Sequence, residues 1–121
     1  MCGIYGEFPF KNKIDTNILI KALEHRGPDH NDVLNIDDGV FVHTRLSIID
    51  LSQKAKQPMS SKCGRYHIIF NGEIYNYIEL RQDLETMGHI FTTQSDTEVL
   101  VHLYEEYGVE KMLNKLRGMF C

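Results

Sequence analysis

The chain has 121 residues, a length typical of one small domain. Hydrophobic residues make up 42% and charged residues 25%, which is close to the globular average and argues against disorder. The net charge of −4 gives no electrostatic support for nucleic-acid binding. No apolar run approaches the roughly 18 residues of a membrane span, so we expect neither nucleic acid nor a membrane as a partner.

The first half of the chain predicts three strands and one short helix. Apolar and small residues predict a strand over Ile4–Phe10, and the apolar face of Asp15–Glu24 predicts a helix. Gly27-Pro28 predicts the stop of that helix, with the glycine in the left-handed conformation that ends many helices. Two further strands, Val33–Ile36 and Val40–Thr44, flank a short acidic turn.

The second half predicts one strand followed by helices. Tyr66–Phe70 is a compact apolar segment that runs into Asn71-Gly72, the strongest short turn signal in the chain. Apolar residues recur at helical spacing over 77–87, 99–107 and 109–116, and a glycine follows each of the first two stretches. Ser95 and Glu98 have the spacing of a capping box before the second stretch.

This order of elements predicts the α+β class. Strands come first, helices follow, and a last strand begins within Arg117–Cys121, so the helices would pack on a mostly antiparallel sheet. Because the chain stops at Phe120-Cys121, inside that last strand, we expect a domain that is incomplete at its C-terminus.

Cysteine and histidine usage predicts the compartment and argues against metal binding. Three cysteines, an odd number without a secretory leader, favour a reduced, cytoplasmic setting over a disulfide framework. No two cysteines have the spacing of a zinc knuckle, and the six histidines are scattered. We therefore expect no metal site.

Cys2 has the clearest chemical potential. If Met1 is removed, one Cα carries both a thiol and a free amine, groups that ordinarily titrate near 8.5 and 8, respectively. The amine can then act as general base for its own thiol, directly or through a water, as it does for N-terminal threonine nucleophiles. Taken alone, Cys2-Gly3 is better interpreted as an ordinary cysteine before a strand.

Four further motifs change that interpretation. The opening segment is Cys2–Gly6, and the four motifs that follow it are His25–Asp29, His43–Leu51, Phe70–Asn76 and Ser95–Val99. In this order and spacing they resemble the class II glutamine amidotransferase domain of glutamine-hydrolysing asparagine synthetases, over essentially the whole chain. Two alternatives stay open: a non-catalytic remnant that keeps the fold, and another class II branch that delivers ammonia to a sugar or nucleotide precursor.

The resemblance implies an αββα sandwich of antiparallel sheets flanked by helices, the N-terminal-nucleophile arrangement, incomplete at its C-terminus. Residues 1–121 would form a partial amidotransferase domain whose partners are L-glutamine and an absent C-terminal synthetase domain. ATP and magnesium would belong to that absent domain, so this chain would need no cofactor of its own.

The implied reaction hydrolyses L-glutamine to glutamate and ammonia, which supplies asparagine synthesis from aspartate and ATP. The Cys2 thiolate would attack the amide carbon, and water would hydrolyse the resulting thioester. The Asn71 side-chain amide and the Gly72 backbone N–H would stabilise the oxyanion; losing one such donor typically costs about 10²–10³ in rate. The alternative for Asn71-Gly72 is a plain hairpin turn.

The resemblance also assigns partners to the α-groups of glutamine. Arg45 would bind the carboxylate, to which a guanidinium can donate two parallel hydrogen bonds. Backbone groups of Ile48 and Ile49 would help. Glu73 and Asp96 match the partners of the ammonium group. The alternatives are a solvated surface pair for Arg45 and Glu73, and for Asp96 an acid favoured by the dipole at a helix N-terminus.

Several other residues would have supporting roles. Arg26 and Asp29 match a loop near the active-site entrance of the family. Tyr75, Asn76 and Asp50 would support the site from behind, and His43 would be structural rather than catalytic.

Overall fold

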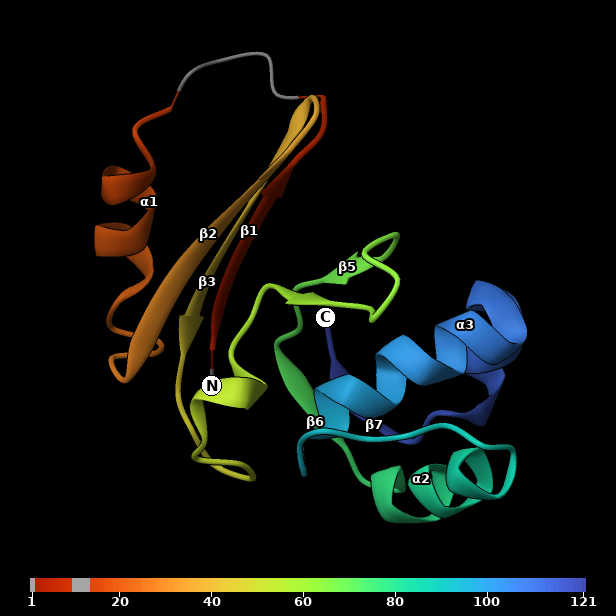
Figure 1. Ribbon diagram of the computed structural model, residues 1–121. Coiled ribbons are helices and arrows are strands. Elements are labelled where there is room, and N and C mark those ends of the chain that lie inside the picture. The colour runs from red at the N-terminus through yellow and green to blue at the C-terminus, as the bar shows by residue number, and fades with distance from the viewer. Residues whose placement is uncertain (1, 10–13) are drawn as a thin grey trace.

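The computed structural model describes residues 2–9 and 14–121, so Met1, whose removal the Cys2 mechanism requires, lies outside the described part. Helices and antiparallel sheets are arranged in layers (Figure 1), and the predicted α+β class is confirmed. Within the described residues, no helix is both long and apolar enough to cross a membrane.

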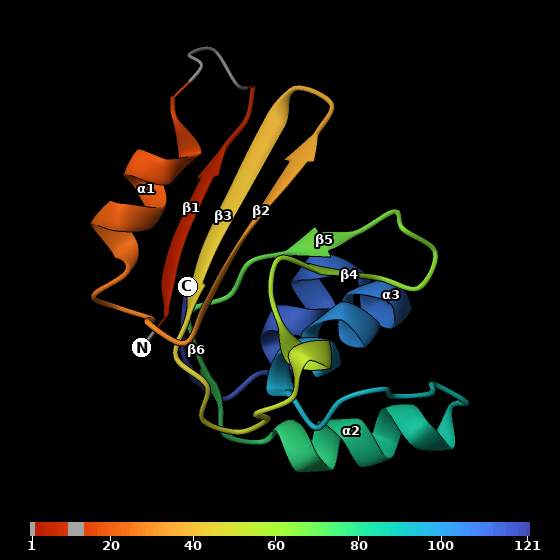
Figure 2. The same cartoon turned by 60° about the vertical axis from the view of Figure 1, so that its left-hand side comes forward.

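The first layers contain helix α1 (Thr16–Leu23) and a three-stranded antiparallel sheet. Its strands are β1 (Gly3–Glu7), β2 (His30–Ile36) and β3 (Gly39–Arg45), in the order β1-β3-β2. The central strand β3 therefore carries most of the buried residues of the sheet, and α1 covers one face (Figure 2). The strands predicted over 33–36 and 40–44 are confirmed and are longer, whereas β1 ends at Glu7.

Helix α1 begins and ends close to its predicted limits. Asp15 caps it by accepting a hydrogen bond from the Asn17 backbone N–H at 2.9 Å. The predicted left-handed conformation of Gly27 is wrong, because among the described glycines only Gly64, Gly88 and Gly108 have a positive φ. Gly27 is needed for a different reason: a Cβ there would collide with the backbone of Thr44.

The remaining layers pack around one apolar core. They contain a short 3₁₀ turn and the elements β4 (Met59–Ser60), β5 (His67–Ile68), β6 (Gly72–Ile74), α2 (Tyr77–Thr86), α3 (Asp96–Lys115) and β7 (Gly118–Phe120). The buried residues of this core are Phe70, Ile74, Leu80, Leu84, Val99, Leu100 and Leu103. The two helical stretches predicted after residue 95 form α3, which is kinked at Gly108, where φ is 71°.

Asn71-Gly72 is not a hairpin turn, so the strongest local turn signal is misleading. The backbone of Asn71 exchanges two hydrogen bonds with Cys121, at 3.0 and 2.9 Å, and Gly72 lies opposite Phe120 in the β6–β7 ladder. A Cβ at Gly72 would collide with the backbone of Met119 and Phe120. Glycine is therefore required here for close strand approach.

Candidate active site

Cys2 lies just before β1, beside the end of β3. The antiparallel register places Gly3 opposite Thr44, so Cys2 falls next to the residues that follow β3. The Leu46 backbone N–H donates to the Cys2 sulfur at 3.5 Å, and the thiol approaches the Leu46 carbonyl at 3.8 Å. The half-buried thiol is thus held by backbone groups and is not in a disulfide.

A pocket of about 90 Å³ opens beside Cys2. The predicted site residues in its lining are Cys2, Arg45, Ile48, Ile49, Gly72, Glu73 and Asp96. Both halves of the chain contribute: the first three-stranded sheet and its following loop on one side, and β6 with the start of α3 on the other. The fold therefore brings together segments that are far apart in the sequence.

Arg45 is buried at the end of β3 and organises the loop that follows. Its guanidinium donates to the Ser52 carbonyl at 2.9 Å and to the Asp50 carbonyl. The Asp50 carboxylate accepts the Gln94 N–H at 2.8 Å, and this hydrogen bond lowers the pKa of Asp50. The loop that carries Ile48 and Ile49 is thus hydrogen-bonded to Arg45 at one end and to the Gln94 backbone through Asp50.

The Gly72 N–H points toward the α3 side of β6. In an antiparallel ladder the N–H groups of one strand alternate between its two edges. Asn71 and Tyr75 donate across to the segment that contains β7, which leaves Gly72 and Ile74 facing the other edge. Asp96 occupies that edge, since its carboxylate accepts the Ile74 N–H at 3.0 Å. The Gly72 N–H therefore faces the same side as Asp96.

Two carboxylates border this edge of the pocket. Asp96 is buried at the first position of α3, whereas Glu73 is exposed on β6. Burial raises the pKa of Asp96 above its ordinary value, and the Glu73 carboxylate adds to the rise. Negative charge at this end of the pocket is thus costly without a cationic partner.

The start of α3 is capped, but not by the predicted capping box. The Ser95 side chain accepts the Thr97 N–H at 3.1 Å, one position before the Glu98 N–H that a capping box would use. Glu98 does not return a bond to Ser95. Its carboxylate accepts the backbone N–H and hydroxyl of both Thr92 and Thr93, at 2.6–2.9 Å. Burial would raise the pKa of Glu98, but these bonds outweigh burial and lower it.

Among the predicted catalytic, substrate-binding and entrance-loop residues, three lie outside the pocket lining: Asn71, Arg26 and Asp29. The residues with predicted supporting or structural roles that also lie outside it are His43, Tyr75 and Asn76. Asn71 is adjacent to Gly72, and its side-chain oxygen is buried without a hydrogen-bond partner among the described residues. Asp29 supports the loop after β3 by accepting the Ser47 N–H at 2.7 Å. Asn76 binds the chain before β7, through the Lys115 carbonyl and the Arg117 N–H, each at 2.9 Å.

Gln57 is a lining residue that sequence reasoning missed. Its buried side chain accepts the Phe70 N–H at 2.6 Å and donates to the Thr97 hydroxyl at 3.2 Å. It joins the strand that leads into Asn71 to the start of α3. No local pattern marks it, because its partners are 13 and 40 positions away.

His43 is fully buried between the two halves, in keeping with a structural role. Its Nε2 lies 3.4 Å from the Phe70 carbonyl. Burial lowers its pKa to about 4, and the Arg45 charge contributes, although the hydrogen bond opposes the shift. His43 is therefore neutral at pH 7 and donates this hydrogen bond from Nε2.

A family model for the glutamine amidotransferase domain matches residues 1–121. The chain belongs to the glutamine amidotransferase family. It is 47% identical over 128 residues to asparagine synthetase [glutamine-hydrolyzing] 1 of Bacillus subtilis, covering 100% of this chain and 20% of that protein. It is 44% identical over 125 residues to the asparagine synthetase [glutamine-hydrolyzing] of Zea mays, covering 99% of this chain and 21% of that protein. This amidotransferase chain thus spans about a fifth of the relatives' length.

Proposed function

We propose that the chain is the glutamine-hydrolysing part of an asparagine synthetase, releasing glutamate and ammonia from L-glutamine. The observation that carries this proposal is the convergence of the Cys2 thiol, Arg45, Gly72 and two carboxylates on one pocket in a chain of the amidotransferase family. The layered arrangement of α1, the sheets, α2 and α3 supports the finer assignment to an αββα N-terminal-nucleophile sandwich (Figure 1).

Cys2 is the proposed nucleophile. Once Met1 is removed, its α-amine takes the thiol proton and the thiolate attacks the side-chain amide carbon of glutamine. The tetrahedral intermediate expels ammonia, with the proton returned to the leaving nitrogen, and a glutamyl thioester remains. Water then attacks the thioester, which releases glutamate and restores the thiol. The net change is one water consumed and one ammonia released per glutamine.

The oxyanion would form beside Gly72 and Asn71. The Gly72 N–H faces away from β7 and has no partner in the β6–β7 ladder, so it is available as a donor. The neighbouring Asn71 side chain would donate from its Nδ2 group, whereas its Oδ1, which can only accept, is buried without a partner among the described protein groups. Donors already in place need no reorganisation when the charge develops, which is the source of their catalytic effect.

Arg45, Glu73 and Asp96 would hold the part of glutamine that does not react. Two guanidinium N–H groups of Arg45 serve the loop, and a guanidinium has five, so others remain for the α-carboxylate. The α-ammonium would sit against Glu73 and Asp96, where its positive charge offsets two nearby negative charges. Ile48 and Ile49 would form the rim above the carboxylate.

The ammonia would serve a synthetase domain. The relatives named above are asparagine synthetases, which supports aspartate as the acceptor. ATP and magnesium would belong to that further domain. Residues 1–121 would then be a partial amidotransferase domain with no cofactor of its own. Three free cysteines support a reducing, cytoplasmic location.

Covalent labelling tests this proposal. Mass spectrometry first establishes whether Met1 is absent, and the chain is then incubated with a diazoketone analogue of glutamine. We expect one adduct on Cys2, none in Cys2→Ala, and unchanged labelling in the matched control Cys63→Ala. A processed chain whose Cys2 stays unmodified would overturn catalysis and favour the non-catalytic remnant.

A further inference from the structure

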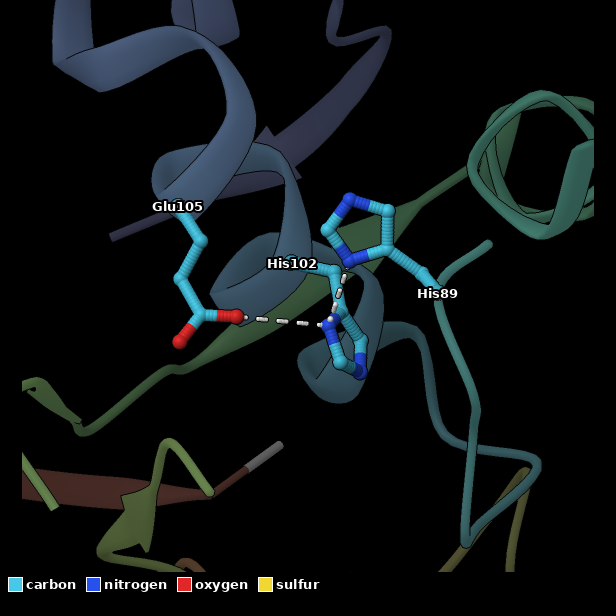
Figure 3. Close-up of side chains that lie close together, drawn as sticks. All are labelled: His89, His102 and Glu105. Atoms are coloured by element: carbon cyan, nitrogen blue, oxygen red, sulfur yellow. Dashed lines mark hydrogen bonds and ion pairs between the residues drawn. The ribbon is translucent and has the colours of Figure 1, made fainter. Parts of the chain in front are cut away.

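A second cluster of chemically active side chains lies away from the pocket, between the α2–α3 connection and α3 (Figure 3). His89 comes from the connection, and His102 and Glu105 lie on neighbouring turns of α3. One nitrogen of each histidine and one oxygen of Glu105 lie within 4.8 Å of one another. The view that the histidines are scattered is thus wrong for this pair in three dimensions.

The two imidazole rings face each other through the same atom. The Nδ1 atoms of His89 and His102 are 3.1 Å apart. On the far side of each ring, Nε2 faces a carboxylate: Glu106 at 3.1 Å from His89, and Glu98 at 3.9 Å from His102. A carboxylate beside Nε2 favours the proton on that nitrogen, as Glu106 does for His89. For His102, Glu98 on the Nε2 side competes with Glu105, which lies 3.5 Å from Nδ1.

With both protons on Nε2, the two Nδ1 lone pairs point at one another. Such an arrangement is repulsive unless a positively charged species binds between the rings. The carboxylates of Glu98, Glu105 and Glu106 surround the pair and make the cluster strongly negative.

We propose that His89, His102 and Glu105 bind a divalent transition-metal ion, with Zn²⁺ as the best match. Glu105 places a carboxylate oxygen 3.5 Å from the His102 Nδ1. Tetrahedral Zn²⁺ with ordinary Zn–N bonds requires ligand atoms about 3.3 Å apart. Two of the three separations here, 3.1 and 3.5 Å, are close to this, and the third, between His89 and Glu105, is within 4.8 Å. Mg²⁺ and Ca²⁺ prefer all-oxygen surroundings and fit this set poorly.

The surrounding groups have the features of an outer ligand shell. Metal-bound histidines usually donate their second ring N–H to a carboxylate, as His89 can to Glu106. The Cys63 thiol approaches the other oxygen of Glu105 at 3.7 Å, which orients that carboxylate. With three protein ligands, solvent would complete the coordination.

Metal binding would fasten the α2–α3 connection to α3. The same connection carries Thr92 and Thr93, which Glu98 binds, and it leads directly to Asp96 at the pocket. The ion would therefore be structural, and the proposal does not depend on glutamine hydrolysis.

The test is Zn²⁺ titration of the metal-free chain by calorimetry, with Co²⁺ absorption as a report on coordination geometry. A background with Cys2→Ala, Cys121→Ala and Cys63→Ser removes thiolate binding and keeps a side-chain donor beside Glu105. We expect one ion per chain, with His89→Ala and His102→Ala each weakening binding about 100-fold and Glu105→Gln about 10-fold. The control His67→Ala changes a histidine on β5, outside the cluster, and should leave affinity unchanged.

Circular dichroism of each variant separates lost binding from lost folding. Glu105 is exposed, so Glu105→Gln should keep the fold and provides a reading even if a histidine variant unfolds. Absence of Zn²⁺ binding to the folded background would overturn the proposal, and a proton between the rings would then explain their approach. Binding that survives Glu105→Gln and both histidine variants at full strength would overturn it too.

Discussion

The two halves of the molecule are stabilised to very different degrees. Around α2 and α3, seven buried apolar side chains form a continuous core. The structure describes all of α1, and every residue of this helix is at least partly exposed. In the adjacent sheet, the fully buried apolar residues among those described are Val40 and Val42, both on β3. The proposed nucleophile thus sits on the weakly packed half, and the carboxylates that would hold the substrate's ammonium group sit on the strongly packed half.

This difference shows how the site depends on the contact between the halves. Cys2 and Arg45 come with the first sheet, whereas Gly72 and Asp96 belong to the core-bearing half. His43 and Gln57 are buried near the boundary, where each bonds to the backbone of Phe70. Loss of the contact would separate the nucleophile from its proposed oxyanion donor without unfolding the α2–α3 core.

The largest effect is expected from truncating the core of the second half. Leu84 on α2 is fully buried, so Leu84→Ala should lower the free energy of unfolding by about 4 kcal/mol through lost burial and a cavity. Ile18 on α1 is 63% exposed, and the matched Ile18→Ala should cost about 0.5 kcal/mol or less. Urea unfolding measures both, and equal losses would contradict the comparison.

Acid should weaken the boundary between the halves through His43. Its pKa falls from an ordinary 6.5 to about 4 on folding, so the folded state favours the neutral ring. The resulting stability is fully present above pH 6.5 and is lost as the pH falls through 4, a total of about 3 kcal/mol. Urea midpoints between pH 7 and pH 4 measure the loss.

The variant His43→Leu serves as the control for this pH effect. It removes the titrating group and should flatten this part of the profile, whereas the matched surface variant His25→Leu should leave the profile unchanged. A wild-type slope that persists in His43→Leu would assign the pH dependence to other groups.

The smallest stability effect is expected at Asp96, with a larger effect on binding. Its pKa is raised, so its contribution to stability is fully present below the ordinary value and is lost as the pH rises through the raised value. Asp96→Asn should therefore raise the melting temperature slightly at pH 7, because the amide oxygen can still accept the Ile74 N–H. The same variant should slow labelling of Cys2 by the glutamine analogue.

Glu73→Gln provides the comparison for Asp96. Glu73 is exposed, so its substitution should slow labelling without raising the melting temperature. A loss of stability in Asp96→Asn at pH 7 would show that the ionised carboxylate stabilises the fold.

Local patterns predicted much of the fold because they depend on neighbours a few residues apart. The helix that begins near Asp15, the helix over 77–86 and the break at Gly108 all follow from such short-range preferences. Asn71-Gly72 shows the limit: its hairpin preference is overridden by pairing with the segment at Phe120-Cys121, which no local signal indicates.

The sequence by itself determined the family, the order of the motifs and most of the residues that line the pocket. Only the tertiary structure decided which backbone N–H groups face the pocket, that Gln57 joins it, and that His89 meets His102. The physical reason is that strand register and helix packing set those positions. Both depend on burying apolar surface between segments that are distant in the chain.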